Sequence, residues 1–399
     1  WVASSFSSVE RGRGSSLPNR GRGRRGCHSG GEKIVRAQPA AAAVVAMGRP
    51  WHHGAPPMRP VSNPPNPWLG QHRELLGEAP PAQLVVHEEE AKSILTANDS
   101  PDLPFRWTLN PYRGCFHGCA YCYARPTHQY LGFGAGTDFE RQLVVKTNAP
   151  ELLRRELQRP SWRGELIAFS GVTDCYQPLE ASYELTRRCL EVCAQFRQPV
   201  GIVTKGALVE RDVDVLADLA RHGAATVFVS VPFADEADAR AIEPYAGSPA
   251  RRLRALRTLA DAGVPVGVSV SPLIPGLNDH QVPAILAAAR AAGARHAFHV
   301  LLRLPAEVEV VFEERLRAAF PQRADKVLSL LTAMRGGQRN DPRFGARMRG
   351  EGPRWQLIAD LFAASAKRLG LSPPSGAAEP SPFRRPHQQG SLFGDPPTT

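Results

Sequence analysis

Cysteine is scarce in this sequence, and long apolar runs are missing. Seven cysteines among 399 residues, three of them clustered, do not suggest the disulfide framework of a secreted domain. No stretch approaches the roughly 18 to 20 apolar residues that a membrane span needs. The Ala-rich stretch at 39–46 is too short for a span and lacks the cleavage context of a signal peptide. These absences exclude a membrane-spanning protein and indicate a cytoplasmic one.

The two ends of the chain have compositions that predict disorder. Residues 1–46 hold eight Lys or Arg against two Glu, so +6 of the net charge of +11 lies in this Gly-, Ser- and Arg-rich segment. The chain begins with Trp1 and its first methionine is Met47. We expect residues 1–46 to be an over-extension of the reading frame, with a basic nucleic-acid-binding arm as the alternative. Residues 371–399 are predicted to form a disordered tail.

The middle of the chain alternates between short apolar runs and stretches with helical periodicity. A Pro-rich segment at 47–104 leads into it. Six β-branched or aromatic runs follow, each before helical material, at 105–109, 166–170, 200–204, 226–231, 264–271 and 296–302. This alternation predicts an α/β fold over residues 105–310, either a partial barrel of six βα units or an open doubly wound sheet, and then a helical extension at 311–370. In both folds the chemistry lies at the carboxyl ends of the strands.

Three of the cysteines lie just after the first predicted strand. The segment "PYRGCFHGCAYCYARP" (111–126) spaces Cys115, Cys119 and Cys122 as C-x₃-C-x₂-C. A structural zinc site needs four ligands, so a Cys₃His site completed by His117 or His128 is one interpretation. An iron–sulfur cubane also has four corners, and three cysteines would leave one iron open for an exogenous chelating ligand.

The pattern C-x₃-C-x-Tyr-C, placed after the first of six βα units, resembles that of the radical S-adenosylmethionine (SAM) superfamily. The segments "AYCYA", "SGVTD" and "IVTKG" are similar, more narrowly, to the spore photoproduct lyase and DNA repair photolyase-like group, over roughly residues 105–310. The resemblance implies a partial (βα)₆ barrel, a [4Fe–4S] cluster held by the three cysteines, and SAM at the open iron. It also implies a 5′-deoxyadenosyl radical that abstracts hydrogen from substrate, and an electron donor such as flavodoxin or ferredoxin.

The same resemblance assigns roles to five other residues, matched by position. It implies that Tyr123 stacks near SAM and that Ser170 and Thr173 lie where the family contacts the methionine amino end. It implies that Lys205 reaches the SAM carboxylate and that Ser230 forms a hydrogen bond near the ribose. From the residues alone, Lys205 could instead be a solvated charge at a strand end, and Ser230 a loop hydroxyl.

One position departs from the photoproduct lyase pattern. Those enzymes carry a hydrogen-donating cysteine immediately before a Thr-Ser-Asp sequence, and Gly171 occupies that place here, within "SGVTD". Cys175 follows four residues later and is our candidate for a shifted catalytic hydrogen donor. The alternative is that Cys175 is a buried structural thiol. Lysis of a thymine dimer is therefore less directly implied than radical chemistry.

Two further segments suggest a nucleic-acid context. The loop "MRGGQRNDPRFGARMRG" (334–350) carries five Arg and interleaves Phe344, so it could bind phosphates and stack on a base, or could simply be a solvated loop over the barrel mouth. The sequence "QGSLF" at Gln389–Phe393 resembles the peptide that docks on the bacterial DNA sliding clamp. Short motifs of this kind also arise by chance.

Together these patterns predict a radical SAM enzyme, lyase-like, that acts on DNA lesions. A radical SAM enzyme that modifies RNA or protein is one alternative. A non-catalytic zinc or iron–sulfur module that recruits partners through its tail is the other. One fold hosts many reactions, so the family resemblance supports the radical chemistry more directly than any particular target.

Overall fold

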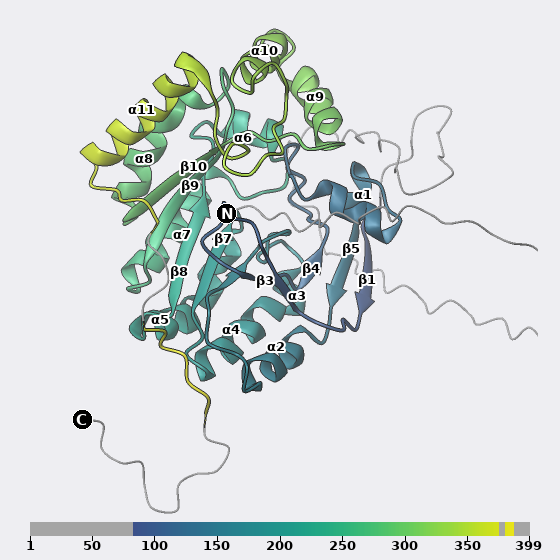
Figure 1. The fold of residues 1–399 in the computed structure, drawn as a ribbon, viewed down its shortest axis with the longest axis vertical. Helices are drawn as coiled ribbons and strands as arrows, with labels where there is room; N and C mark the ends of the chain where they lie inside the picture. The colour runs from purple at the N-terminus through teal and green to yellow at the C-terminus, as the bar shows by residue number, and fades with distance from the viewer. Residues whose placement is uncertain (1–82, 375–379, 387–399) are drawn as a thin grey trace, which may run out of the picture.

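The computed structural model describes residues 83–374 and 380–386 (Figure 1). The predictions for the basic segment 1–46, for residues 47–82 of the Pro-rich segment and for Gln389–Phe393 therefore fall outside the described residues.

A seven-stranded sheet forms the centre of the molecule, in the order β10-β9-β8-β7-β6-β3-β2. Six of its strands run parallel in chain order: β3 (Trp107–Leu109), β6 (Ile167–Phe169), β7 (Val200–Thr204), β8 (Ala225–Ser230), β9 (Val266–Leu273) and β10 (His296–Leu301). The seventh, β2 (Leu95–Ala97), pairs antiparallel with β3 and ends the sheet. The predicted α/β fold with a parallel sheet typical of a radical SAM partial barrel is confirmed.

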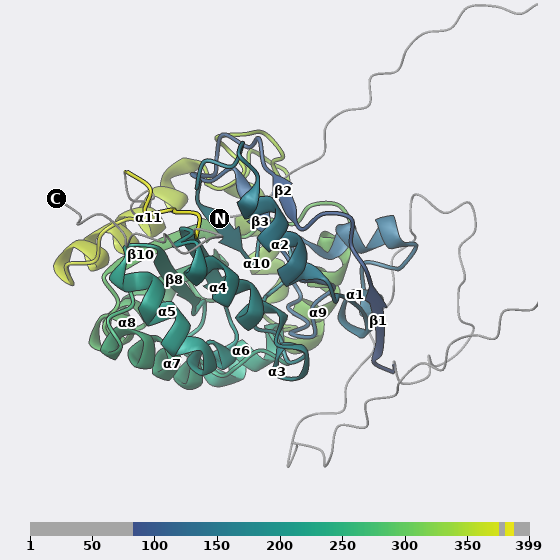
Figure 2. The same cartoon turned by 90° about the horizontal axis from the view of Figure 1, so that it is seen from below.

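Helices cover the outer face of this curved sheet (Figure 2). The crossover helices are α4 (Leu185–Gln195), α5 (Val213–Arg221), α7 (Pro249–Asp261) and α8 (Val282–Ala291), and α2 (Ala149–Gln158) packs beside α4. Each crossover helix buries a leucine completely in the core, namely Leu190, Leu216, Leu256 and Leu286. Full burial of such a side chain contributes about 1.5 to 3 kcal/mol, which fixes each helix against its strands.

The helical stretch between β6 and β7 is broken in two. A short helix, α3 (Glu180–Tyr183), ends at Glu184, whose φ of 51° is left-handed, and α4 begins immediately after it. The buried carboxylate of Glu180 accepts hydrogen bonds from the backbone N–H groups of Thr186 and Arg187, at 2.9 and 3.2 Å. These groups have no partner inside the first turn of a helix, so Glu180 stabilises a new helix start that periodicity does not reveal.

A small second sheet, in the order β1-β5-β4, supports the cysteine loop. It consists of β1 (Val85–Glu89), β5 (Gln142–Lys146) and β4 (Tyr112–Arg113). The short helix α1 (Thr137–Arg141) lies just before β5, and the backbone N–H of Cys115 donates to the carbonyl of Phe139 at 2.9 Å. Part of the Pro-rich lead-in thus contributes two strands, β1 and β2, one to each sheet.

The C-terminal part adds α9 (Val308–Ala319), α10 (Ala324–Ala333) and α11 (Gly352–Arg368), with α6 (Glu236–Ile242) contacting α9. Helix α11 returns to pack on α8 (Figure 1). Residues 380–386 belong to the segment expected to be disordered, yet they lie against the core because Phe383 stacks on Phe196 with ring centroids 6.1 Å apart. Among the described residues, no helix is both long enough and apolar enough to cross a membrane.

Candidate active site

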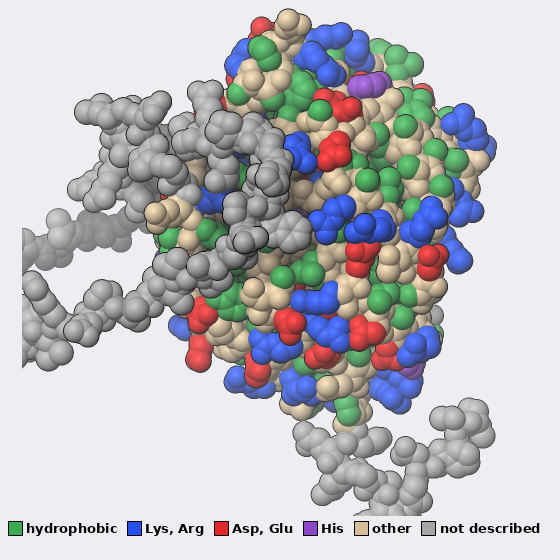
Figure 3. Space-filling model, turned by 180° about the vertical axis from the view of Figure 1, so that it is seen from behind, with side chains coloured by type: hydrophobic (Ala, Val, Ile, Leu, Met, Phe, Trp, Pro, Cys, Tyr) green, Lys and Arg blue, Asp and Glu red, His purple; other side chains and the backbone are tan. Residues whose placement is uncertain are grey.

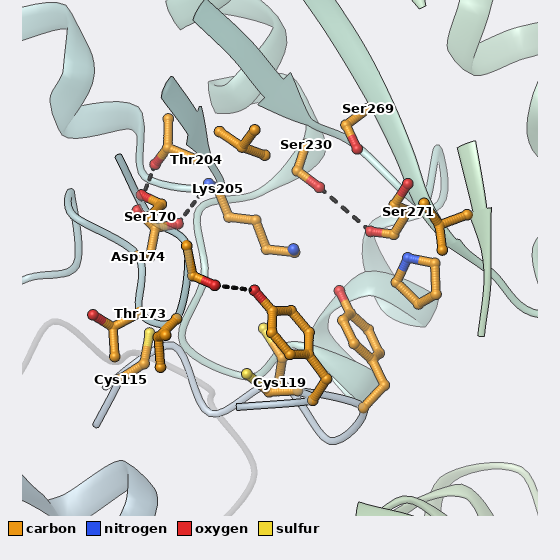
Figure 4. Close-up of a pocket in the computed structure, with 18 of the residues that line it drawn as sticks. Cys115, Cys119, Ser170, Thr173, Asp174, Thr204, Lys205, Ser230, Ser269 and Ser271 are labelled. Carbon is orange, nitrogen blue, oxygen red and sulfur yellow. Dashed lines mark hydrogen bonds between the residues drawn. The ribbon is translucent and has the colours of Figure 1, made fainter. Parts of the chain in front are cut away.

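A cavity lies at the carboxyl ends of the parallel strands, beside the cysteine loop (Figure 4). Eight of the nine predicted site residues line it: Cys115, Cys119, Cys122, Tyr123, Ser170, Thr173, Lys205 and Ser230. The exception is Cys175. Residues separated by more than a hundred positions therefore meet at one place, as expected for the edge of a parallel sheet where strand ends converge.

The cysteine loop depends on glycine to bring its three thiols to one cavity wall. Gly114 has a φ of 74°, and a Cβ atom there would lie 2.7 Å from Leu143 Cδ2 and 2.9 Å from the carbonyl oxygen of Phe139. Only glycine adopts this backbone conformation without strain in so little space. Burial raises the pKa of all three cysteines. Thiolates at such a place need a bound cation to form, which is the usual property of a metal-binding cysteine set.

The thiols and histidines do not fit a single zinc ion. In a tetrahedral zinc site the sulfurs lie about 3.8 Å apart, as follows from Zn–S bonds of about 2.3 Å. Within residues 83–374 and 380–386, no three His, Cys, Asp or Glu side chains gather tightly enough to hold one metal ion. The ring of His117 is 3.4 Å from Asp174 Oδ2, whereas His128 Nε2 is 2.7 Å from the carbonyl of Gln142 and lies off the cavity. With His117 facing Asp174 and His128 off the cavity, the three thiols lack a fourth ligand among the residues that the structure describes, which suits an iron–sulfur cubane with one open iron.

Asp174 is a site residue to which the sequence assigned no role. Its carboxylate accepts from Thr204 Oγ1 at 2.6 Å and from the backbone N–H of Lys205 at 2.7 Å, and it faces the ring of His117. Burial alone would raise the pKa of Asp174, but His117 and the hydrogen bonds from Lys205 and Thr204 outweigh burial and hold the pKa below its ordinary value. Asp174 therefore stays ionised and joins the cysteine loop to the ends of β6 and β7.

Lys205 and a group of serines form the polar walls of the cavity. The ammonium of Lys205 lies 5.5 Å from the ring centroid of Tyr121 and points into the cavity (Figure 4). Ser230, Ser269 and Ser271 come from the neighbouring strands β8 and β9, and the buried hydroxyl of Ser271 has no hydrogen-bond partner in the described structure. These groups can accept a polar ligand such as a ribose or an amino acid moiety.

Ser170 and Thr173, two of the predicted SAM contacts, use their hydroxyls within the protein. Ser170 has a left-handed φ of 67°, and its Oγ accepts from the backbone N–H of Cys175 at 2.9 Å. Thr173 donates from Oγ1 to the carbonyl of Tyr112 at 2.9 Å. Both therefore shape the loop after β6, and a ligand here would meet their backbone more readily than their hydroxyls.

A buried ion pair supports the cysteine loop from the other side. Arg252 Nη2 lies 2.5 Å from Glu243 Oε2, and both side chains are almost completely buried. Tyr121 donates its hydroxyl to Glu243, while Arg252 Nη1 donates to the carbonyl of Ser230 at 3.0 Å. The chain Tyr121–Glu243–Arg252–Ser230 thus connects the cysteine loop to the end of β8. The sequence around Glu243 does not reveal its contact with Tyr121, which comes from a distant part of the chain.

The structure separates Cys175 from the cavity. Its side chain is 0% exposed and packs in the main apolar core. A Cβ atom at Gly171, the place of the thiol in the lyases, would lie 3.0 Å from Thr108 Cγ2. In the described part of the chain, the cavity is thus lined by no cysteine other than the three in the loop. This placement favours the buried-thiol interpretation of Cys175.

The arginine-rich loop is largely tied down by carboxylates and carbonyls of the protein itself. Arg347 is buried, and its Nε lies 2.5 Å from Asp102 Oδ2. Arg343 Nη2 lies 2.7 Å from Asp341 Oδ2. These pairings support the solvated-loop interpretation more than a phosphate-binding stripe. On the face opposite to that of Figure 1, Lys and Arg side chains are mixed with Asp and Glu (Figure 3).

Comparisons with known proteins agree with this geometry. The model of the radical SAM superfamily matches residues 109–289. An uncharacterized protein of Mycobacterium tuberculosis is 42% identical over 197 residues, which cover 49% of this chain and 58% of that relative. An uncharacterized protein of Methanocaldococcus jannaschii is 32% identical over 174 residues, which cover 44% of this chain and 62% of that relative. This chain thus spans about three fifths of the length of these curated relatives.

Among solved structures, spore photoproduct lyase complexed with dinucleoside spore photoproduct is similar with a TM-score of 0.53 and 15% identity, covering 76% of this chain and 86% of that one. At this identity the likeness concerns the fold alone. The family match implies a [4Fe–4S] cluster and SAM as cofactors. Residues 109–289 of this chain therefore match the radical SAM superfamily in sequence, and the chain shares the fold of a solved spore photoproduct lyase.

Proposed function

We propose that this chain is an enzyme that cleaves SAM reductively, with Cys115, Cys119 and Cys122 each ligating one iron of a [4Fe–4S] cluster. The observation that carries the proposal is the convergence of these three thiols on a cavity that Lys205 and several hydroxyls also line. When bound, the reduced cluster supplies one electron to the sulfonium of SAM, which yields methionine and a 5′-deoxyadenosyl radical. Reduced flavodoxin or ferredoxin is the proposed source of that electron.

The protein's own residues bind and orient SAM in this proposal. The ammonium of Lys205 pairs with the carboxylate of SAM, since it is a cation that points into the cavity. Tyr123 is fixed by a 2.6 Å hydrogen bond from its hydroxyl to the carbonyl of Gly171, and it presents its ring to the ligand. Ser230 and Ser271 face the ribose. Such positioning brings the radical carbon and the substrate hydrogen into contact.

We further propose a lesion in DNA as the substrate. Support comes from the shared fold with a lyase whose solved complex holds a dinucleoside photoproduct. Because Gly171 stands in place of the lyase thiol and Cys175 is buried away from the cavity, the hydrogen that ends the reaction must come from another donor. The proposed chemistry is therefore hydrogen abstraction from a damaged base, after which no thiol at position 171 donates a hydrogen atom to the product radical.

A substrate panel tests this assignment. The reconstituted, reduced protein is incubated with SAM and ultraviolet-irradiated DNA, intact DNA or RNA, and 5′-deoxyadenosine release is compared with the basal rate. We expect irradiated DNA alone to accelerate release and to lose a lesion in proportion. Acceleration by RNA, or by none of the three, would refute the DNA assignment while leaving basal SAM cleavage intact.

We also propose that Gln389–Phe393 binds the DNA sliding clamp. The segment lies outside the described residues, and the proposal rests on its sequence. In a pull-down from purified components, the wild type should be retained by the clamp and a Leu392→Ala, Phe393→Ala double variant should not. Equal retention of the two proteins would dismiss this interaction.

A further inference from the structure

Arg303 is a cation in the cavity wall for which the described structure provides no counter-ion. It lies two residues after the end of β10 and lines the cavity. Its Nε atom is buried without a hydrogen-bond partner, and its Nη1 makes only a 4.0 Å contact with the sulfur of Met348. Within residues 83–374 and 380–386, no carboxylate lies at ion-pair distance from Arg303.

This lack of a partner distinguishes the partly buried Arg303 from four of the buried arginines in the described part of the chain. Arg125, Arg252 and Arg347 each contact a carboxylate, namely Glu140, Glu243 and Asp102. Arg335 instead donates to the backbone carbonyls of Leu301 and Leu302. Among the described residues, Arg303 thus has neither a carboxylate nor a carbonyl as a hydrogen-bond partner.

An unpaired guanidinium at such a place is energetically unfavourable. Burial, and then the positive charge of Arg347, lower the pKa of Arg303 to about 10. Asp102 acts in the opposite direction, but its carboxylate is already bound to Arg347. Holding a charge partly out of water without pairing it is unfavourable. A bound anion would remove this penalty, so the site favours an anionic ligand.

SAM cannot supply that anion to both cations of the cavity. It carries one carboxylate, which the proposed function assigns to Lys205 at the end of β7. Arg303 lies just beyond β10, three strands further along the sheet than β7. Asp174, the ionised carboxylate of the cavity wall, is already bound by Thr204 and the backbone of Lys205, so an anion that pairs with Arg303 would come from the substrate.

We propose that Arg303 is a substrate-binding residue that holds a phosphate of a nucleic acid in the cavity. The inference rests on the proposed function, because it places SAM on Lys205 and a nucleic acid in the remaining space. A guanidinium donates from Nε and Nη along a flat edge that matches two oxygens of a phosphate, which a lysine cannot reproduce. Such a contact would hold the substrate at a fixed position relative to the radical carbon.

Binding of a small probe to the oxidised, SAM-loaded holoenzyme tests Arg303 without turnover. The probes are ultraviolet-irradiated thymidylyl-thymidine and its uncharged methylphosphonate analogue. We expect Arg303→Gln to weaken binding of the charged probe at least tenfold and to leave the neutral one unchanged, with Arg303→Lys in between. Arg343→Gln is the matched control, because Arg343 is exposed and paired with Asp341 outside the cavity. Equal affinities of wild type and Arg303→Gln for the charged probe would overturn the inference.

Two further measurements separate this inference from the proposed function. The SAM dissociation constant should be the same in wild type and Arg303→Gln, and a tenfold increase would instead place Arg303 in the SAM site and contradict the inference. Inorganic phosphate should raise the melting temperature of SAM-loaded wild type but not of Arg303→Gln. If phosphate does so while neither thymidine probe binds the wild type, the anion site stands and its assignment to nucleic acid is overturned, together with the DNA substrate.

Discussion

The backbone N–H of Lys205 donates a 2.7 Å hydrogen bond to Oδ2 of Asp174, and this bond joins the loop after β6 to the end of β7. The second oxygen of the same carboxylate accepts from Thr204 Oγ1 at 2.6 Å and from the backbone N–H of Tyr176 at 2.9 Å. Asp174 is thus a positioning residue. It sets where the Lys205 side chain enters the cavity without needing to contact SAM itself.

Replacing Asp174 with Asn should weaken SAM binding more than it weakens the fold. The amide keeps one acceptor but presents an N–H₂ group to donors, so at least one buried hydrogen bond is lost, at a cost of about 1 to 3 kcal/mol. We expect a tenfold or greater increase in the SAM dissociation constant, with the melting temperature lowered by several degrees. Asp218→Asn removes a carboxylate from an exposed pair with Arg221 and serves as the control. Unchanged SAM affinity in Asp174→Asn would contradict the positioning role.

Removing one member of the Glu243–Arg252 pair should destabilise the protein strongly. Both side chains are buried, so Arg252→Met leaves the Glu243 carboxylate without its counter-ion, which typically costs about 3 to 5 kcal/mol. The double variant Glu243→Gln, Arg252→Met should lose clearly less than the sum of the two single variants. Chemical denaturation of all four proteins measures this coupling. Additive losses would show that the two residues act independently.

Cys175 should prove dispensable for chemistry. Cys175→Ala removes a sulfur that is 0% exposed in the core and should lower the free energy of unfolding by about 1 to 2 kcal/mol. SAM cleavage and the distribution of products should be the same as in wild type. Abortive products with SAM cleavage intact would instead restore Cys175 as the hydrogen donor and require the loop after β6 to move.

His299 should make stability depend on pH. The centroid of its ring lies 4.2 Å from that of Phe362 and 5.6 Å from that of Trp355, both of α11. Burial, together with the positive charge of Arg349, lowers the pKa of His299 to about 4. Between pH 6.5 and 4 the unfolded chain binds a proton at this histidine and the native protein does not, so stability falls as pH falls through this window. Relative to neutral pH, the stability lost by pH 5 is on the order of 2 kcal/mol. The full stability is present above pH 6.5.

His299→Phe is the variant that isolates this effect. It keeps an aromatic ring between β10 and α11 but cannot titrate. Its free energy of unfolding, measured from pH 7 to 4.5, should fall less steeply than that of wild type. Parallel pH profiles for the two proteins would exclude His299 as a contributor.

Local pattern was sufficient for much of the fold. The run "VGIVT" predicts a strand at 200–204, and β7 is Val200–Thr204. Such strands are buried, apolar and flanked by amphipathic helices, so composition and periodicity determine them. The spacing of Cys115, Cys119 and Cys122 likewise predicts that their thiols lie together, because a short loop cannot separate them.

Features that depend on tertiary contacts could not be predicted. Strand β1 forms only because it pairs with β5, more than fifty residues away, and its half-exposed sequence carries no clear alternation. The roles of Asp174 and Glu243 depend on partners brought by other strands. The unpaired state of Arg303 emerges only after every nearby carboxylate has been assigned a partner.

The central claim is that three thiols hold an iron–sulfur cubane whose open iron binds SAM. The most direct measurement is 5′-deoxyadenosine release by the anaerobically reconstituted, dithionite-reduced protein, together with its metal content. The account predicts about four irons per chain, as the cubane requires, and release of 5′-deoxyadenosine that Cys115→Ala, Cys119→Ala or Cys122→Ala abolishes. Stoichiometric zinc in place of iron, or intact SAM after reduction of an iron-loaded protein, would contradict it.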